Sequence, residues 1–219
     1  MVDGGSRNYS RNIAAGINSW CTNRFSALFS LRKLLRSRST NLLFCDNKLG
    51  IELRTLESQY FQVINFKTAK LFESCGSLAG VLNEVNYEKQ ADLSRLGNIF
   101  GIMFQLTDDI LDYSGKEIEI GKNVGDDLAE GKVTLPLIYA MKNGTDNQSK
   151  LIKDAIKMGD INRLPDIIQV LSDTNAIATV QKHLAFKVVE VNEVLGKFDD
   201  SETKSTLNAL AHYIVERKG

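Results

Sequence analysis

Three aspartates and a glutamine lie close together within residues 104–113, which read as one helical segment. At 100° per residue, Gln105, Asp108, Asp109 and Asp112 fall within an arc of about 100° and form one stripe. Carboxylates in this arrangement, with no histidine or cysteine nearby, favour a hard divalent cation such as Mg²⁺. Mg²⁺ held by few carboxylates takes its remaining ligands from water and phosphate. The stripe therefore has the chemistry to hold Mg²⁺ together with a phosphorylated ligand.

The alternative is an acidic helix face that meets only water. The flanks argue against it, because residues 97–103 and 110–111 contain no charge, whereas a solvated face would normally include Lys or Glu. A buried helix cannot direct uncompensated carboxylates at hydrocarbon, since each charge would cost several kcal/mol or become protonated. We therefore expect cations to face the stripe.

Three lysines are candidates for contact with a phosphate. Lys122 and Lys132 follow the acidic helix in glycine-flanked positions, which allow close backbone approach. Lys67, beside Thr68, is expected to lie buried in the middle of another helix. Each lysine alone is better explained as a solvated charge or a stem that extends along the surface to water. Together with the acids they would form a site suited to a metal-bridged diphosphate.

The elements that position these residues are predicted to be helices. Two prolines and few alternating β-branched residues argue against strands. Apolar residues at spacings of three and four, from Leu56 to Leu82, predict one long helix over residues 55–82, and the acidic stripe ends a second over 88–113. Thr134 and Ser201 are candidate N-caps. Shorter helices are predicted over 126–130, from Thr134 to about 141, and over 148–158, 160–171, 174–198 and 202–217.

No repeat or linker interrupts the chain after residue 50, so residues 53–219 are predicted to form one all-α helical bundle. Residues 1–52 differ: no acidic residue stands between Asp3 and Asp46, while arginines and serines accumulate. This composition is that of an organellar transit peptide or of a degraded or replaced amino-terminal part of the fold, and we favour the second interpretation. A helix is predicted over residues 25–35.

Composition excludes several functions. Among 219 residues, 27 Lys and Arg balance 27 Asp and Glu, so no overall field recruits nucleic acid or an anionic membrane. No apolar run approaches the 18 residues of a transmembrane helix. Three cysteines without metal-site spacing suit a reducing compartment, and a cytoplasmic location is expected.

Several of these stretches resemble the trans-type polyprenyl diphosphate synthases. Residues 104–112 with 121–141 resemble the second aspartate-rich region of that family, residues 59–68 its Lys-Thr helix, and residues 210–217 its carboxyl end. Within the family the resemblance is closest to the octaprenyl diphosphate synthases. It covers about residues 53–218.

The resemblance implies an all-α synthase, usually a homodimer, that joins isopentenyl diphosphate head to tail to an allylic diphosphate with Mg²⁺ as cofactor. Its product would be a polyprenyl diphosphate, such as the octaprenyl precursor of a quinone side chain. The implied metal ligands are Asp108, Asp109 and Asp112. The implied contacts to the allylic diphosphate are Lys67, Thr68, Gln105, Lys122 and Lys132. Asp108, Asp109 and Lys67 would be the catalytic residues.

The chain departs from the family pattern in two places. Val133 replaces a usual proline, and only residues 1–7 are similar to the end of the first aspartate-rich region, with Asp3 as its last acid. The expected consequence is a truncated copy with impaired activity. Two alternatives remain: a non-catalytic helical subunit that pairs with an intact synthase, and a terpene cyclase, against which residues 121–126 argue.

Overall fold

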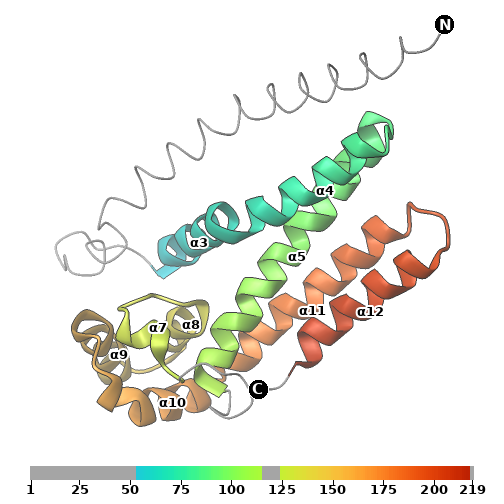
Figure 1. The fold of residues 1–219 in the computed structure, drawn as a ribbon. Coiled ribbons are helices and arrows are strands. Elements are labelled where there is room, and N and C mark those ends of the chain that lie inside the picture. Colours follow the sequence, from blue (N-terminus) through green and yellow to red (C-terminus); the bar gives the residue numbers. More distant parts are fainter. Residues whose placement is uncertain (1–52, 115–123, 218–219) are drawn as a thin grey trace, which may run out of the picture.

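The computed structural model of the chain describes residues 53–114 and 124–217, and these residues form helices and turns without a strand (Figure 1). The predicted all-α bundle is confirmed for this part of the chain. None of its helices is long and apolar enough to cross a membrane. The elements are α3 (Leu53–Ile64), the π-helix η1 (Asn65–Ala69), α4 (Lys70–Leu82), α5 (Tyr87–Ser114), α7 (Asp126–Ala129), α8 (Leu135–Asn143), α9 (Asp146–Met158), the 3₁₀ turn η2 (Ile161–Arg163), α10 (Leu164–Asp173), α11 (Ala176–Leu195) and α12 (Glu202–Glu216).

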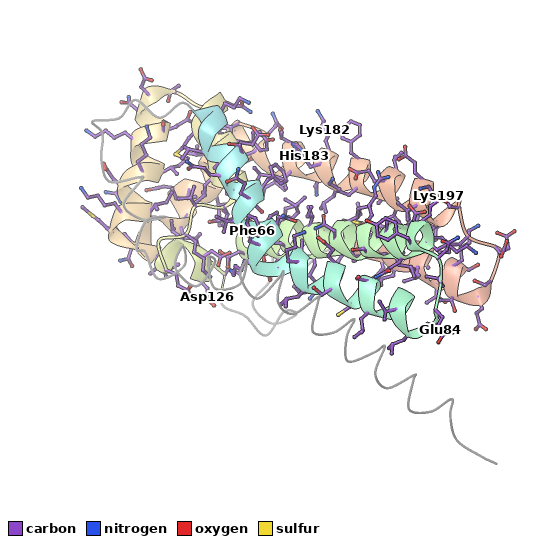
Figure 2. The ribbon with its side chains drawn as sticks, turned by 90° about the horizontal axis from the view of Figure 1, so that it is seen from above. Phe66, Glu84, Asp126, Lys182, His183 and Lys197 are labelled. Atoms are coloured by element: carbon purple, nitrogen blue, oxygen red, sulfur yellow. The ribbon has the colours of Figure 1, made fainter. Side chains whose placement is uncertain are left out.

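Helix α5 is the centre of the arrangement. The run α3–η1–α4 packs along one side of it and α11 and α12 pack along the other, while α7 to α10 gather where α5 ends (Figure 1). Glu84 and Lys197 mark one end of the molecule and Asp126 lies near the other (Figure 2). The acidic stripe occupies the last turns of α5, so it lies at the end where α7 and α8 meet the central helix.

The core forms on the apolar side of α5, where Met103 and Leu106 are completely buried, and it continues into α8 and α11. Each such side chain contributes about 1.5–3 kcal/mol when removed from water. Phe104 is an apolar residue of α5 that lies outside this core. It is 48% exposed, and its ring packs on Phe72 of α4 with centroids 5.8 Å apart.

Glycines allow α4 to approach α5 closely. A Cβ atom at Gly97 would overlap the carbonyl oxygen of Phe72, and one at Gly101 would lie 2.5 Å from the Cα atom of Ala69. Only glycine permits this approach of the two backbones. The contact brings η1, which carries Lys67 and Thr68, against the acidic half of α5.

The predicted helix over residues 55–82 is confirmed as a continuous run, but η1 interrupts its α-helical hydrogen bonding. A π turn closes i→i+5 bonds and so holds one residue more than an α turn. Residues seven apart share one face of a regular helix. Here Ile64 is 3% exposed and Leu71 is 62% exposed, because η1 lies between them. The apolar residues before and after η1 therefore lie on different faces.

The remaining predicted helices are present, with small shifts at their ends. Ser201 is the N-cap of α12, since its side chain accepts a hydrogen bond from the Lys204 N–H at 3.1 Å. Thr134 occupies the N-cap position of α8 without capping it; its hydroxyl donates to the Tyr113 hydroxyl at 3.2 Å instead. The predicted helix over residues 160–171 divides into η2 and α10. The helix predicted over residues 25–35 lies outside the described residues.

Candidate diphosphate and metal site

The four residues of the stripe differ in exposure. Asp109 and Asp112 are buried, with 2% and 4% of their surface exposed, whereas Gln105 and Asp108 are half-buried. Asp108 is thus the more accessible of the two adjacent carboxylates. Asp109 is enclosed between α5 and the run α3–η1, and it has one hydrogen-bond partner on α3 and one on α5.

Two hydrogen bonds hold the Asp109 carboxylate. The Tyr60 hydroxyl of α3 donates to Oδ2 at 2.6 Å, and the Gln105 amide donates to Oδ1 at 2.8 Å. The Thr68 hydroxyl donates in turn to Oε1 of Gln105 at 2.9 Å. Burial raises the pKa of Asp109 to about 6, while the bonds from Tyr60 and Gln105 oppose this by favouring the charged form. A cation at the stripe would favour the carboxylate further.

A tight turn before α7 closes the other end of the stripe. The Asp127 N–H donates to Oδ2 of Asp112 at 3.2 Å, and the Gly125 N–H donates to the Asp112 carbonyl at 2.9 Å. Gly125 has φ of 89°, a left-handed conformation that favours glycine. Lys132 pairs with Asp127 at 2.7 Å and with Glu130 at 2.8 Å. Burial alone would lower the pKa of Lys132, but these two carboxylates outweigh it and raise that pKa well above its usual range.

The structure brings some predicted residues together and separates others. Thr68, Gln105 and Asp109 form one hydrogen-bonded chain. The predicted burial of Lys67 is wrong: its side chain is exposed on η1. Lys132 reaches the stripe only through Asp127, whose backbone N–H holds Asp112. Lys122 lies outside the described residues, so its role stays a prediction.

Two residues of the site were not predicted. Tyr60 stands 49 residues before its partner Asp109, and its place in an apolar series suggested only packing. Asp127 is buried and binds Asp112 and Lys132, yet in the sequence it is one of two adjacent acids in a loop. The sequence feature that could have indicated its burial is the apolar residue directly after it, Leu128, which is completely buried in the structure.

The donor set fits a hard cation that a ligand helps to hold. Within the described ranges, no three carboxylate, histidine or cysteine side chains converge as a complete metal cage. Asp108 and Asp112 are four residues apart on one helix face and offer only oxygen atoms. This suits Mg²⁺, which accepts one or two carboxylates and completes its shell with water and phosphate. The residues therefore fit Mg²⁺ bound together with a diphosphate.

Apolar side chains adjoin this polar region. Phe72 lies one helical turn after Thr68, and its ring contacts Phe104, the neighbour of Gln105. Beyond them, α4 turns an uncharged face to the outside. We call this the outer face of α4; its residues are Leu71, Cys75, Leu78 and Leu82, and its leucines are 45–62% exposed. A polar end with an apolar extension suits an amphiphilic ligand.

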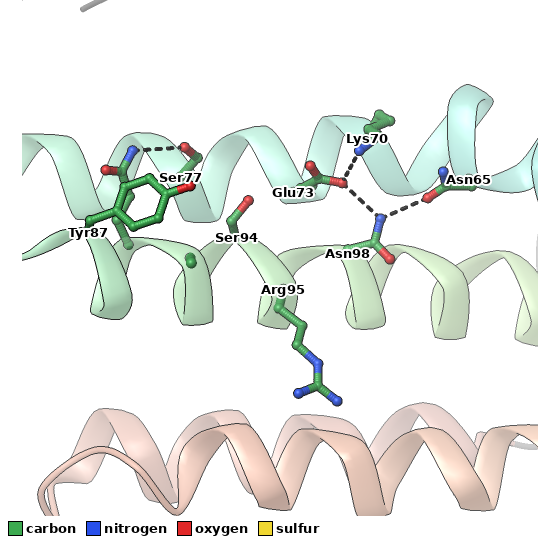
Figure 3. A pocket seen from close by; sticks show the side chains of 10 residues that line it. Asn65, Lys70, Glu73, Ser77, Tyr87, Ser94, Arg95 and Asn98 are labelled. Atoms are coloured by element: carbon green, nitrogen blue, oxygen red, sulfur yellow. Dashed lines mark hydrogen bonds and ion pairs between the residues drawn. The ribbon is translucent and has the colours of Figure 1, made fainter. Parts of the chain in front are cut away.

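A cavity of about 630 Å³ lies in another part of the α4–α5 contact (Figure 3). The Asn98 amide donates to Asn65 at 2.8 Å and to Glu73 at 3.0 Å, and Lys70 pairs with Glu73 at 2.6 Å. Asn98 precedes Gln105 by seven residues, or about 10 Å along the helix. The polar lining of this cavity does not suit a hydrocarbon, and its hydrogen bonds tie η1 and α4 to α5.

Known proteins are similar to this chain in sequence and in fold. The family profile described as polyprenyl synthetase matches residues 41–172. The octaprenyl diphosphate synthase of Haemophilus influenzae is 38% identical over 167 residues, which cover 74% of this chain and 50% of that protein, and the Escherichia coli enzyme is 35% identical over 162 residues with the same coverage. A solved polyprenyl synthase from Caulobacter crescentus, with calcium and isoprenyl diphosphate, superposes with a TM-score of 0.71 at 27% identity, covering 90% of this chain and 61% of that one.

The described helices have the all-α fold of the solved polyprenyl synthases. The chain belongs to the polyprenyl synthetase family, as its sequence predicted. It spans about half the length of the curated relatives it matches.

Proposed function

We propose that this chain carries the allylic-diphosphate half of a Mg²⁺-dependent prenyltransferase. The reaction would join isopentenyl diphosphate head to tail to an allylic diphosphate and give a polyprenyl diphosphate, with octaprenyl as the length that the named relatives suggest. The observation that carries the proposal is the hydrogen-bonded chain from Thr68 through Gln105 to Asp109, on the stripe shared with Asp108 and Asp112. We also propose that residues 53–219 form this functional unit and that residues 1–52 contribute no residue to its site.

Each side chain has a distinct role in this proposal. Asp108, which is half-buried, and Asp112, which is buried, would supply oxygen ligands to the metal. The Asp109 carboxylate would add a third negative charge. Thr68 and Gln105 orient the diphosphate, while the ammonium groups of Lys67, Lys122 and Lys132 meet its oxygens. Bound Mg²⁺ supplies Lewis-acid stabilisation of the departing diphosphate. No protein nucleophile is needed, because the double bond of isopentenyl diphosphate attacks the allylic carbon.

The apolar surface beside the stripe supports a prenyl substrate. Phe72 and Phe104 stack next to Gln105, so a hydrocarbon tail leaving the diphosphate would meet aromatic rings. Contact with these rings would keep water from the reacting allylic carbon. Phosphorylated ligands without a tail would lose this contact and bind more weakly.

Activity is proposed to be impaired. Within residues 1–52 the acids are Asp3, Asp46 and Glu52, so these residues supply no second aspartate-rich face. Loss of one preorganised electrostatic contact already costs about 10²–10³ in rate. We propose a cytoplasmic chain that acts as a homodimer or with a related synthase.

A second candidate is a non-catalytic subunit that pairs with an intact synthase. Two exposed apolar side chains of α11 favour it: Phe186 is 69% exposed and Val189 is 54% exposed. Size-exclusion chromatography of the chain mixed with the E. coli octaprenyl diphosphate synthase tests this candidate. A shared peak with no activity of the chain alone would support it, and separate elution would exclude this pairing.

The decisive experiment compares Asp108→Ala with Asp126→Ala by calorimetric titration of an unreactive allylic diphosphate, with and without Mg²⁺. Asp108→Ala is expected to weaken Mg²⁺-dependent binding about tenfold or more, since a hydrogen bond or contact to a charged group contributes about 1.5–3 kcal/mol. Asp126 begins α7, where an acid complements the helix amino terminus, so its loss should change binding little. Equal effects at unchanged helicity, or binding independent of Mg²⁺, would contradict the site.

A further inference from the structure

The outer face of α4 is uncovered in the described part of the chain. Leu71 is 62% exposed, Leu78 45% and Leu82 50%, and Cys75 is exposed between them. Charge is almost absent beside them: residues 71–83 include only Glu73, which is buried on the opposite side and paired with Lys70. Solvated helix faces normally carry charged residues, and contiguous exposed apolar residues mark contact surfaces.

We propose that residues 25–35 of the same chain dock on the outer face of α4. In helical projection, Ala27, Leu28, Leu31, Leu34 and Leu35 share one side of this segment, which we call its leucine side. Next to Leu34 follow Ser30, Ser26 and Lys33, and Phe25 and Phe29 lie between Lys33 and Arg32. An eleven-residue helix is about 16 Å long, close to the span of about 16–17 Å from Leu71 to Leu82. Segment and face therefore match in polarity and in length.

The connection is long enough for this docking. Seventeen residues, 36–52, join the segment to the start of α3. Fully extended, they reach about 56–61 Å. The run from residue 53 to 82 is about 45 Å long if counted as α-helix, so every point of α4 lies within reach. Docking on the same chain needs no rearrangement of the described helices.

Charge favours this segment over a second copy of α4. Residues 1–52 contain eight Lys and Arg against three Asp and Glu, a net charge of +5. Because the whole chain has a net charge of zero, residues 53–219 carry −5. Opposite net charges attract the leading segment to residues 53–219, whereas residues 53–219 of another copy carry the same net charge of −5 and are repelled. The apolar side chains then select the outer face of α4. The inference does not depend on the proposed catalytic function.

Reactivity of the Cys75 thiol tests the docking in the full chain. Cys21→Ser and Cys45→Ser leave Cys75 as the only thiol, and its rate of reaction with a maleimide is measured without ligand. The rate is expected to be well below that in urea. Leu31→Asp with Leu35→Asp should raise the reaction rate of Cys75 about tenfold or more, because docking would bury both leucines and aspartates in their place oppose it. Ser26→Asp with Ser30→Asp adds the same charge on the side of the segment that carries Lys33, and this variant should leave the reaction rate of Cys75 unchanged.

A second measurement covers the case in which the leucine variant loses helicity. In the single-thiol chain, Leu31→Cys is expected to form a disulfide with Cys75 within one molecule under mild oxidation. Three results would overturn the inference. In the first, Cys75 reacts as fast in the folded chain as in urea; in the second, its protection disappears on dilution and the protein has the mass of a dimer. In the third, the leucine variant leaves Cys75 protected and the Leu31→Cys variant forms no intramolecular disulfide.

Discussion

Asp108 and Asp109 are adjacent in sequence, yet the structure gives them different environments. Asp109 is 2% exposed and receives hydrogen bonds from Tyr60 and Gln105. Asp108 is half-buried and closer to solvent. A carboxylate fixed by two donors organises a site, whereas its more exposed neighbour can be reached by a ligand from solvent. We therefore propose that Asp109 positions the site and that Asp108 binds the ligand.

Tyr60→Phe tests the organising role of Asp109. The substitution keeps the ring and removes the 2.6 Å hydrogen bond to a buried carboxylate. Loss of one partner of a buried polar group costs about 1–3 kcal/mol of unfolding free energy. Tyr213→Phe is the matched control, because Tyr213 is 63% exposed on α12. Urea unfolding of both variants measures the difference, and equal values would show that the bond contributes nothing to stability.

The sequence predicted the stripe because its four members lie within eight residues of one helix. It could not predict Tyr60 or Asp127, because their roles depend on where a distant helix and a glycine turn meet α5. Lys67 was expected to be buried from its position in mid-helix, but η1 holds it at the surface. Local periodicity determines which residues share a face. It does not determine which face is covered.

Among the elements, the α4–α5 pair depends most on glycine. Gly97 and Gly101 lie on the side of α5 that meets α4, at positions where any side chain would collide with backbone atoms. The same approach places Thr68 within hydrogen-bonding distance of Gln105. Helix contact and site geometry are therefore coupled through these two residues.

Gly97→Ala is expected to destabilise the protein by about 1–3 kcal/mol, because a Cβ atom there overlaps the Phe72 carbonyl and the helices must separate. Helix propensity alone would favour alanine by about 0.5–1 kcal/mol. Gly196→Ala is the control, since its Cβ atom would lie 3.2 Å from the Asn192 carbonyl oxygen and needs only a small adjustment. Thermal unfolding monitored by helicity compares them; a stabilised Gly97→Ala variant would contradict this packing.

The helices themselves were largely predictable. Strong apolar periodicity predicted both ends of α5 to within one residue, and the capping residue Ser201 predicted the start of α12. The π turn was not predicted, because Asn65–Ala69 has no sequence feature that separates it from ordinary helix. It lies where η1 packs against α5, a contact between residues that are far apart in the sequence.

At the scale of the whole molecule, a polar cluster joins helices from three parts of the chain. The Tyr139 hydroxyl of α8 donates to Glu57 of α3 at 2.8 Å, so it accepts from Nε2–H of His183 on α11 at 2.6 Å. The rings of Tyr139 and His183 stack with centroids 5.7 Å apart. Figure 2 places His183 on the side of the molecule away from Glu84 and Asp126.

Acid should weaken this connection. Burial lowers the pKa of His183, with Glu57 acting against this and Lys187 adding to it. The unfolded chain therefore takes up a proton near pH 6.5 while the folded chain stays neutral, so the unfolding free energy falls as pH decreases below that value. His183→Gln should flatten this dependence in urea titrations at several pH values. The control His212→Gln replaces an exposed residue of α12 and should leave the pH dependence of the unfolding free energy unchanged.

The π turn also changes how α3–α4 responds to a change in chain length. Removing one residue from an ordinary helix rotates everything beyond it by about 100°. Removing one from Asn65–Ala69 takes away the surplus residue of the turn and leaves both flanking segments oriented as they are. Phe66 is 42% exposed and has no role in the proposed site. Its deletion should therefore lower the melting temperature less than deletion of Leu71, and α4 would keep its contact with α5 through a regular helix.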